Sequence, residues 1–244
     1  MGIELTILPH QEDFLKAIVK AFDGIRIFDS KDPYSNPLID LTDEKIRENI
    51  ENLWQGYENL QAIPSKWRGS DDENYLGLDI RMETGTGKTY CYTRMMYELN
   101  QRYGFNKFIV LVPSTPIREG AKSFLSADYS KKHFSDLYPN KSLDLSVLEA
   151  QKRKSGRKNF PYAVSEYVRG TNLQKNRFSV LLLSSGMLLS KATMEKDDYD
   201  QTLMGNFTQP YGAIKATRPI VIIDEPHRFK KENKAYKTLI KEIN

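Results

Sequence analysis

A glycine-rich segment in the first half of the chain has the residue types that bind phosphate groups. Its sequence is Glu83-Thr84-Gly85-Thr86-Gly87-Lys88-Thr89. The two glycines let the backbone wrap closely around phosphate oxygens, and the start of a following helix adds partial positive charge. Lys88 would reach the β- and γ-phosphates of a nucleotide, and the Thr89 hydroxyl would hold Mg²⁺. The strict pattern has glycine where Met82 stands, so an ordinary Gly-rich turn is the alternative interpretation.

Two acidic residues late in the chain form the second candidate site. The apolar run Ile220–Ile223 leads directly into Asp224 and Glu225, and Pro226 disfavours further strand pairing. Asp224 would hold Mg²⁺ through water, and Glu225 would orient and deprotonate the water that attacks the nucleotide. A solvated turn after a strand is the alternative interpretation.

Four short apolar runs predict the strands that position these motifs. They fit strands buried on both faces, as in a parallel sheet covered by helices, and they span residues 75–82, 107–112, 178–183 and 219–223. Apolar residues recur at helical spacing in four segments: 14–25, 46–57 after Thr42 as a possible N-cap, 92–103 and 236–243. Residues 29–37 and 62–74 have the composition of loops. Alternating strands and helices predict an α/β domain with ligands at the carboxyl ends of its strands.

The two motifs and their surroundings resemble the superfamily-two helicases and DNA translocases. They are more closely similar to the restriction (Res) subunit of Type III restriction–modification enzymes. The segments that carry this resemblance are 78–89, 107–120 and 218–229, and it is weakest over 127–172. The resemblance implies a RecA-like parallel sheet sandwiched by helices, the first lobe of a P-loop NTPase motor. We expect that lobe over residues 75–244, with a polar and basic insertion near 127–172, after an N-terminal helical segment over 1–74.

The resemblance also assigns roles to weaker signals. The segment Leu8-Pro9-His10-Gln11 is similar to one whose glutamine reads the adenine edge, and a Gln amide can both donate and accept there. Pro113-Ser114-Thr115 matches a motif that grips the DNA backbone, and Ser185 would belong to a second such turn. His227 would couple the nucleotide site to the rest of the motor. A polar helix start at Gln11 and ordinary strand-to-helix turns at the other two places are the alternatives.

The function that the resemblance implies is an ATP-dependent DNA translocase. Its cofactors would be ATP and Mg²⁺, and its partners double-stranded DNA and the modification methyltransferase (Mod) subunit. Such a motor has a second RecA-like lobe with an arginine finger, and the Res subunit adds a nuclease domain. Because the sequence stops at Asn244, before the next motif, we expect an amino-terminal motor lobe that lacks cleavage chemistry and has barely detectable ATPase alone. A different superfamily-two helicase and a non-hydrolysing nucleotide- or DNA-binding module are the alternatives.

Composition excludes several other classes of protein. The chain has 244 residues, of which 39% are hydrophobic, and no apolar run approaches the length of about 18 residues that a membrane helix needs. A single cysteine, Cys91, excludes a disulfide framework and a multi-cysteine zinc site. With no signal-peptide pattern, we expect a cytoplasmic protein that has no membrane partner. The net charge of +4 is compatible with nucleic acid but does not require it.

Three remaining features have less specific interpretations. The basic run Lys152–Lys158 would either contact DNA electrostatically or form a solvated loop. His10 and His133 have no partner visible in the sequence, so we expect both to be surface residues.

Overall fold

A four-stranded parallel sheet forms the centre of the protein. The computed structural model describes residues 4–41, 43–53, 55–58, 76–150, 159–228 and 234–243. The sheet has the strand order β4-β5-β3-β6, with bounds β3 (Lys107–Val112), β4 (Ser142–Val147), β5 (Arg177–Ser184) and β6 (Ile220–Ile223). Val110 of β3 lies between Leu182 of β5 and Ile222 of β6. Since β3 pairs on both sides and all six of its residues are buried, it is the central strand of the core.

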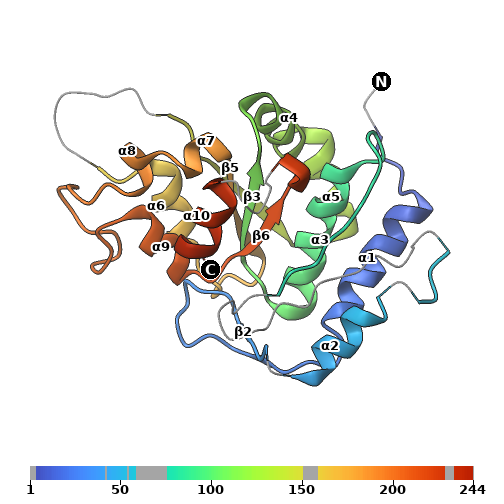
Figure 1. The fold of residues 1–244 in the computed structure, drawn as a ribbon. Coiled ribbons are helices and arrows are strands. Elements are labelled where there is room, and N and C mark those ends of the chain that lie inside the picture. The colour runs from blue at the N-terminus through green and yellow to red at the C-terminus, as the bar shows by residue number, and fades with distance from the viewer. Residues whose placement is uncertain are drawn as a thin grey trace.

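Helices cover both faces of this sheet (Figure 1). One face carries α1 (Pro9–Ala21), α3 (Lys88–Tyr103), α4 (Thr115–Ser126) and α5 (Asp128–Leu137). The other carries α6 (Tyr162–Arg169), α7 (Ser185–Leu188), α8 (Lys191–Met194), α9 (Pro210–Ala216) and α10 (Lys234–Glu242). Phe108 and Val110 face the first layer, and Ile109 faces the second, because successive strand residues point to opposite faces. The expected α/β sandwich is therefore confirmed.

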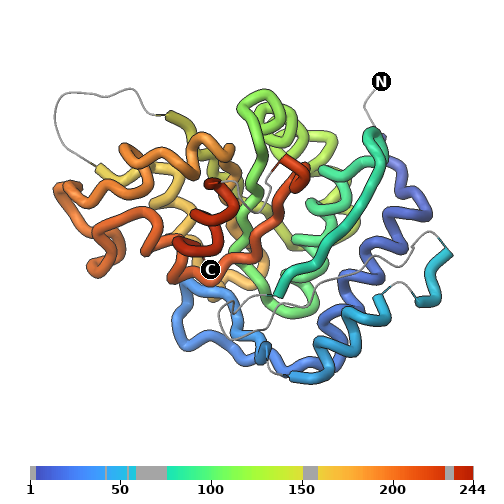
Figure 2. The backbone as a smooth tube through the Cα atoms, viewed as in Figure 1, coloured from blue at the N-terminus to red at the C-terminus, as the bar shows by residue number. Residues whose placement is uncertain are grey.

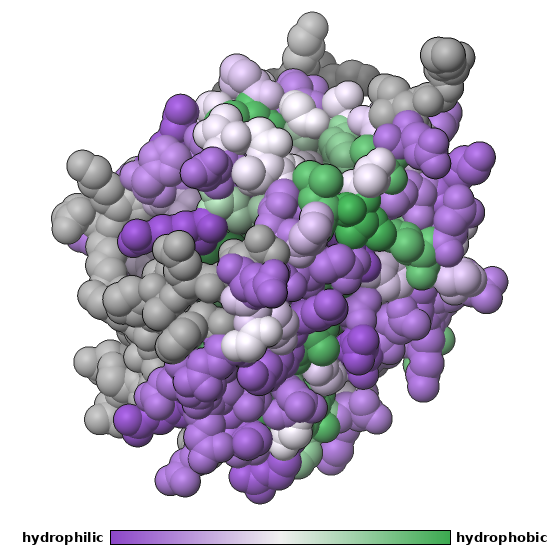
Figure 3. Space-filling model, turned by 90° about the vertical axis from the view of Figure 1, so that its right-hand side faces the viewer, coloured by the Kyte–Doolittle hydropathy of each residue, from purple (hydrophilic) through white to green (hydrophobic). Residues whose placement is uncertain are grey.

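The N-terminal segment lies beside the first helical layer. The tube in Figure 2 shows α1 and α2 (Glu44–Glu51) on the same side of the molecule as the glycine-rich segment. A two-stranded antiparallel hairpin of β1 (Ile27–Phe28) and β2 (Leu38–Ile39) joins these two helices. The side chain of Asp43 caps α2 by accepting a hydrogen bond from Lys45 N at 3.0 Å, whereas Thr42, the expected cap, lies outside the described residues. Figure 3 shows that this side of the protein is mainly hydrophilic with a narrow hydrophobic strip.

The run at 75–82 was expected to be a strand buried on both faces, and this expectation is wrong for its described part. Residues 76–82 form extended chain to which no strand is assigned. Leu76, Leu78 and Met82 pack against the core, but Ile80 is 42% exposed. Because the run alternates apolar and polar side chains along much of its length, only part of it is drawn into the core.

The polar stretch over 127–172 contributes regular elements to the sandwich. It contains α5, β4 and α6, and β4 is an edge strand of the central sheet. Leu143, Leu145 and Val147 pack against the core, while Asp144 forms an ion pair with Arg177 of the neighbouring strand. This strand alternates apolar and polar residues, so it has no continuous apolar run that would have identified it. The basic run within the stretch lies outside the described residues.

Some helical faces agree with the sequence periodicity better than others. The apolar residues expected on α1 and α3 are mostly buried, and α10 contains the segment expected near the end of the chain. The second segment ends earlier than predicted, because α2 stops at Glu51. Among the described helices, none has the length and apolar character needed to cross a membrane.

Asn36 joins the loop between β1 and β2 to the amino ends of the central strand β3 and of its neighbour β6. Its Oδ1 accepts hydrogen bonds from Asn106 N at 2.8 Å and Lys107 N at 2.9 Å. Its Nδ2 donates to Lys107 O at 2.8 Å and Arg218 O at 2.9 Å. The side chain is 1% exposed, so these bonds satisfy buried backbone groups where β3 and the segment before β6 begin.

Lys107, the first residue of β3, is a fully buried lysine. Its ammonium donates to the carbonyl oxygens of Tyr167 and Val168 at the end of α6, and it lies 5.0 Å from the centre of the Tyr167 ring. Burial lowers the pKa of Lys107 to about 7, while Asp144 and Asp32 act in the opposite direction. The ammonium is held by carbonyl oxygens and a ring, with no carboxylate bonded to it among the described residues.

Replacing Asn36 should destabilise the protein strongly. Asn36→Ala leaves several buried backbone groups without a partner, so we expect the free energy of unfolding to fall by about 2–4 kcal/mol. Denaturant titration followed by circular dichroism measures this change. Asn206→Ala removes an exposed amide and serves as the matched control. Equal stability of the two variants would contradict the anchoring role of Asn36.

Lys107 should make stability increase with pH above neutrality. The unfolded lysine has a pKa near 10.5, so between about pH 7 and pH 10 the unfolded chain binds the extra proton. Stability then rises with pH in that window, by about 1–2 kcal/mol from pH 7 to pH 9. Lys107→Met should abolish this difference in denaturant titrations, and Lys131→Met, at an exposed position, should retain it. The same pH slope in the wild type and Lys107→Met would refute the assignment.

Candidate functional site

The glycine-rich segment forms a tight loop that leads into α3. Gly85 and Gly87 have φ angles of +84° and +86°, which side-chain-bearing residues rarely adopt. At Gly87 a Cβ atom would also lie 2.7 Å from Gln11 Nε2. The loop closes through Thr86, whose Oγ1 donates to Glu83 O at 2.7 Å. The backbone can therefore hold this shape only with glycine at both places.

Lys88 begins α3 and reaches back across the loop. Its Nζ donates to Met82 O at 3.1 Å and to Glu83 O at 3.2 Å. The N-terminus of a helix presents N–H groups without intrahelical partners, and here that end borders the loop. The Lys88 ammonium, the free N–H groups at the start of α3 and the backbone of the loop glycines thus lie together. Groups of these kinds bind phosphate in proteins.

The first acid lies at the carboxyl edge of the sheet, close to this loop. Asp224 follows β6, and its backbone N donates to Leu111 O at 2.9 Å, so pairing with β3 continues one residue further. Burial and the neighbouring Glu225 raise the pKa of the Asp224 carboxyl, while the Lys88 ammonium lowers it. Lys88 and Asp224 are therefore near enough to interact electrostatically, although they are far apart in the sequence.

Glu225 is held in an uncommon backbone conformation. Its φ angle is +52°, a region that costs a residue other than glycine about 1–3 kcal/mol and that is frequent at functional sites. Arg228 contributes to holding it, because its backbone N donates to Glu225 O at 3.0 Å and its Nε lies 3.1 Å from Glu225 Oε2. His227 lies between them in a short 3₁₀ helix, Pro226–Arg228, and is exposed.

The first turn of α1 lies against the glycine-rich segment Glu83–Thr89, the phosphate loop. Gln11 is 5% exposed, and its Nε2 donates to Thr86 O at 3.1 Å while its Oε1 accepts from Leu8 N at 3.1 Å. His10 Nε2 also lies 3.1 Å from Thr86 O. His10 and His133, which were expected to be surface residues, are both partly exposed, but each has a partner that the sequence did not show, because His133 Nε2 lies 3.0 Å from the Tyr90 hydroxyl. Such contacts join distant segments, so the sequence carries no local signal for them.

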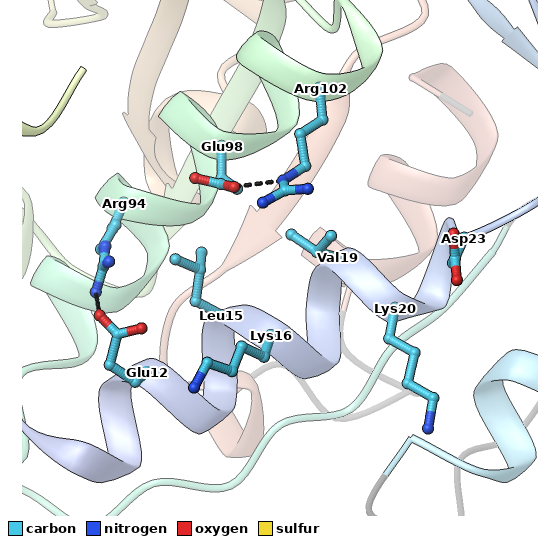
Figure 4. Close-up of a pocket in the computed structure, with 9 residues that line it drawn as sticks. All are labelled: Glu12, Leu15, Lys16, Val19, Lys20, Asp23, Arg94, Glu98 and Arg102. Carbon is cyan, nitrogen blue, oxygen red and sulfur yellow. Dashed lines mark hydrogen bonds and ion pairs between the residues drawn. The ribbon is translucent and has the colours of Figure 1, made fainter. Parts of the chain in front are cut away.

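An ion pair and apolar contacts hold α1 beside α3. The two helices line a groove of about 420 Å³, in which Arg94 of α3 pairs with Glu12 of α1 (Figure 4). Leu15 and Val19 of α1 lie further along it. Acidic and basic side chains both border the groove, so it has no strong preference for an ion of one sign. The position of Gln11 on the loop therefore rests on the packing of α1 against α3.

The two turns expected to contact DNA lie side by side. Pro113-Ser114-Thr115 follows β3 and starts α4, while Ser185 follows β5 and starts α7. Because β3 and β5 are parallel neighbours, both turns emerge at the same edge. The Ser185 hydroxyl donates to Pro113 O at 2.9 Å, which links the turns directly. The acids follow β6, on the other side of β3, so the turns and the nucleotide motifs share one edge of the sheet.

The polar groups at this edge fit a nucleotide-bound magnesium ion. The described residues contain no group of three or more His, Cys, Asp or Glu side chains that could hold a metal without other ligands. Mg²⁺ bound with a nucleotide takes most of its oxygens from phosphate and water, so it needs few ligands from the protein. The Thr89 hydroxyl and the Asp224 carboxylate are oxygen groups of the kind that such an ion takes from a protein. The hydroxyl of Tyr92 is a further buried oxygen, with no hydrogen-bond partner within 3.5 Å among the described residues, and Thr89 and Asp224 both affect its pKa.

Comparison with known proteins places the chain in one family. The family model described as "Type III restriction enzyme, res subunit" matches residues 4–244. The chain is 43% identical to the Res subunit of the Type III restriction-modification enzyme StyLTI of Salmonella typhimurium, over 98% of this chain and 21% of that protein. The Res subunits of EcoP15I of Escherichia coli and EcoPI of Escherichia phage P1 are each 34% identical over 96% of this chain and 24% of theirs.

These matches agree with the fold. The chain spans about a fifth to a quarter of the length of these relatives. The parallel sheet between two helical layers is that of a RecA-like helicase lobe, which is the fold of the matched region. The chain belongs to the Type III restriction enzyme Res subunit family.

Proposed function

We propose that this chain is the ATP-binding and ATP-hydrolysing lobe of an ATP-dependent DNA translocase. The observation that carries the proposal is the meeting of Lys88 and the glycine loop with Asp224 and Glu225 at the carboxyl edge of the sheet. The names of the relatives favour the restriction subunit of a Type III restriction–modification system over other helicases. Because the chain spans only part of those relatives, the activity of the whole protein belongs to this proposal.

Each side chain of the site has a distinct part in binding ATP. The loop from Glu83 to Gly87 offers backbone N–H groups to the phosphates, and Lys88 neutralises the β- and γ-phosphates. Gln11 would turn its amide to the adenine edge, since it already lies on the loop. Thr89 and Asp224 would hold Mg²⁺, whose charge offsets that of the phosphate oxygens.

Hydrolysis needs a base and an oriented water. The Glu225 carboxylate would accept a proton as the water oxygen bonds to the γ-phosphorus, and the bond to the bridging oxygen of ADP breaks. ADP and inorganic phosphate are then released. His227, exposed and two residues further on, would couple this event to the rest of the motor.

The DNA would lie along the same edge of the sheet. Pro113, Ser114, Thr115 and Ser185 would contact phosphates of the duplex backbone through hydroxyls and helix-start N–H groups. Such contacts position the duplex without reading its sequence. Recognition of a specific site would then require a partner, which we propose is the modification methyltransferase (Mod) subunit of the same system.

Lys88→Ala should weaken nucleotide binding without unfolding the protein. It removes the charge that faces the phosphates, so we expect affinity for Mg-ATP to fall by about 10- to 100-fold. Alanine is a good helix former, so the melting temperature should change little. Isothermal titration calorimetry measures the affinity, with Lys132→Ala at an exposed position as the control. Equal affinity in Lys88→Ala and wild type would refute the site.

Glu225→Gln should separate binding from turnover in the full-length protein. The amide keeps the shape of the side chain but cannot take a proton, so we expect unchanged ATP affinity and turnover lowered by about 10²-fold or more. A steady-state ATPase assay measures turnover, and Glu166→Gln on the exposed side of α6 is the control. Asp224→Asn should instead reduce the degree to which Mg²⁺ tightens binding. Normal hydrolysis by Glu225→Gln would show that another group is the base.

A further inference from the structure

The hydroxyl of Tyr92 is a buried polar group without a close hydrogen-bond partner. Tyr92 is 6% exposed, and its hydroxyl oxygen has no hydrogen-bond partner within 3.5 Å among the described residues. Other tyrosines of α3 differ in this respect: the Tyr90 hydroxyl pairs with His133 at 3.0 Å, and the Tyr103 hydroxyl donates to Val19 O at 3.0 Å. Leaving a buried hydroxyl unpaired costs about 1–3 kcal/mol, whereas phenylalanine would fill the same space without that cost. The hydroxyl therefore calls for an explanation other than packing.

Helix geometry directs this side chain to the phosphate loop. Tyr92 follows Thr89 by three residues in α3, so the two lie on the same face one turn apart. Side chains in a helix tilt toward its N-terminus, which carries the Tyr92 ring back over the turn that holds Thr89. The buried hydroxyl is thus aimed at the end of the helix that borders the phosphate loop.

Both magnesium-binding candidates act on this hydroxyl. Burial raises the pKa of Tyr92, a weak hydrogen bond with the Thr89 side chain lowers it, and the charge of the Asp224 carboxylate raises it. A hydroxyl can accept one hydrogen bond and donate another. When a threonine oxygen gives a lone pair to a cation, its proton needs an acceptor, and a phenol oxygen beside it can be that acceptor.

We propose that Tyr92 is a positioning residue for the magnesium ion, with its hydroxyl orienting the Thr89 hydroxyl and linking it to Asp224. The inference rests on the proposed nucleotide site. The hydroxyl completes its hydrogen bonds only when the nucleotide and the ion are bound, which explains why it has no partner within 3.5 Å here among the described residues. Groups that orient the ligands of a metal typically change metal affinity by 10- to 100-fold when they are removed.

The experiment compares Tyr92→Phe with Tyr90→Phe in the purified protein. Binding of a fluorescent ADP analogue is titrated with excess EDTA and then at increasing Mg²⁺ concentration. For Tyr92→Phe we expect unchanged affinity in EDTA and a loss of about tenfold in the tightening that Mg²⁺ produces. Tyr90→Phe loses a hydroxyl bonded away from the site, so its response to Mg²⁺ should equal that of the wild type.

Thermal unfolding without ligand supplies a second readout. Because Tyr92→Phe removes an unpaired buried hydroxyl, its melting temperature should equal or exceed that of the wild type. Tyr90→Phe, which breaks a hydrogen bond, should melt at a lower temperature. A lowered melting temperature in Tyr92→Phe, or equal loss of affinity with and without Mg²⁺, would assign the hydroxyl to the fold and overturn the proposal.

The Lys88→Ala variant separates this inference from the proposed function. If Lys88→Ala loses nucleotide affinity while Tyr92→Phe responds to Mg²⁺ like the wild type, the nucleotide site stands and the inference about Tyr92 is wrong. If the wild type binds no nucleotide, or Lys88→Ala binds it equally well, the proposed function fails and the inference about Tyr92 fails with it.

Discussion

Parallel pairing of β3 with a neighbour on each side is the constraint on which the candidate site depends. Parallel strands present all their carboxyl ends at one edge, so the segments after β3, β5 and β6 emerge together there. Those segments contain Pro113, Ser185 and Asp224. The hydrogen bond from Asp224 N to Leu111 O extends this pairing to the first acid and fixes its distance from the central strand.

Both edges of the sheet hold buried or strained groups, and the candidate site lies at the carboxyl edge. At the amino edge, Asn36 and Lys107 occupy buried positions where their polar atoms bond to backbone groups of neighbouring elements. The buried amide of Asn106 at that edge lacks a partner within 3.5 Å among the described residues, and Arg218 has a φ angle of +48°. At the carboxyl edge, the loop glycines and Glu225 have positive φ angles. Such groups persist only where the surrounding structure holds them.

The position of α1 shows how a remote segment completes the site. Gln11 and His10 both contact Thr86 O, although they precede it by 75 and 76 residues in the sequence. The pairing of Glu12 with Arg94 keeps α1 aligned with the helix that starts at the phosphate loop. A movement of the glycine-rich loop on binding phosphate would therefore shift the start of α1 as well. Contacts of the loop and of Gln11 with a nucleotide would then change together.

The sequence by itself determined the features that depend on a residue and its near neighbours. Glycines in the loop, a lysine at the helix start and acids after an apolar strand are local patterns, and three of the four predicted strands follow from continuous apolar runs. Only the tertiary structure decided that β4 joins the sheet, that residues 76–82 run outside it, and that His10 and Tyr92 lie near the site. These outcomes depend on which distant segments pack together, and packing is set by strand order and helix placement rather than by local periodicity.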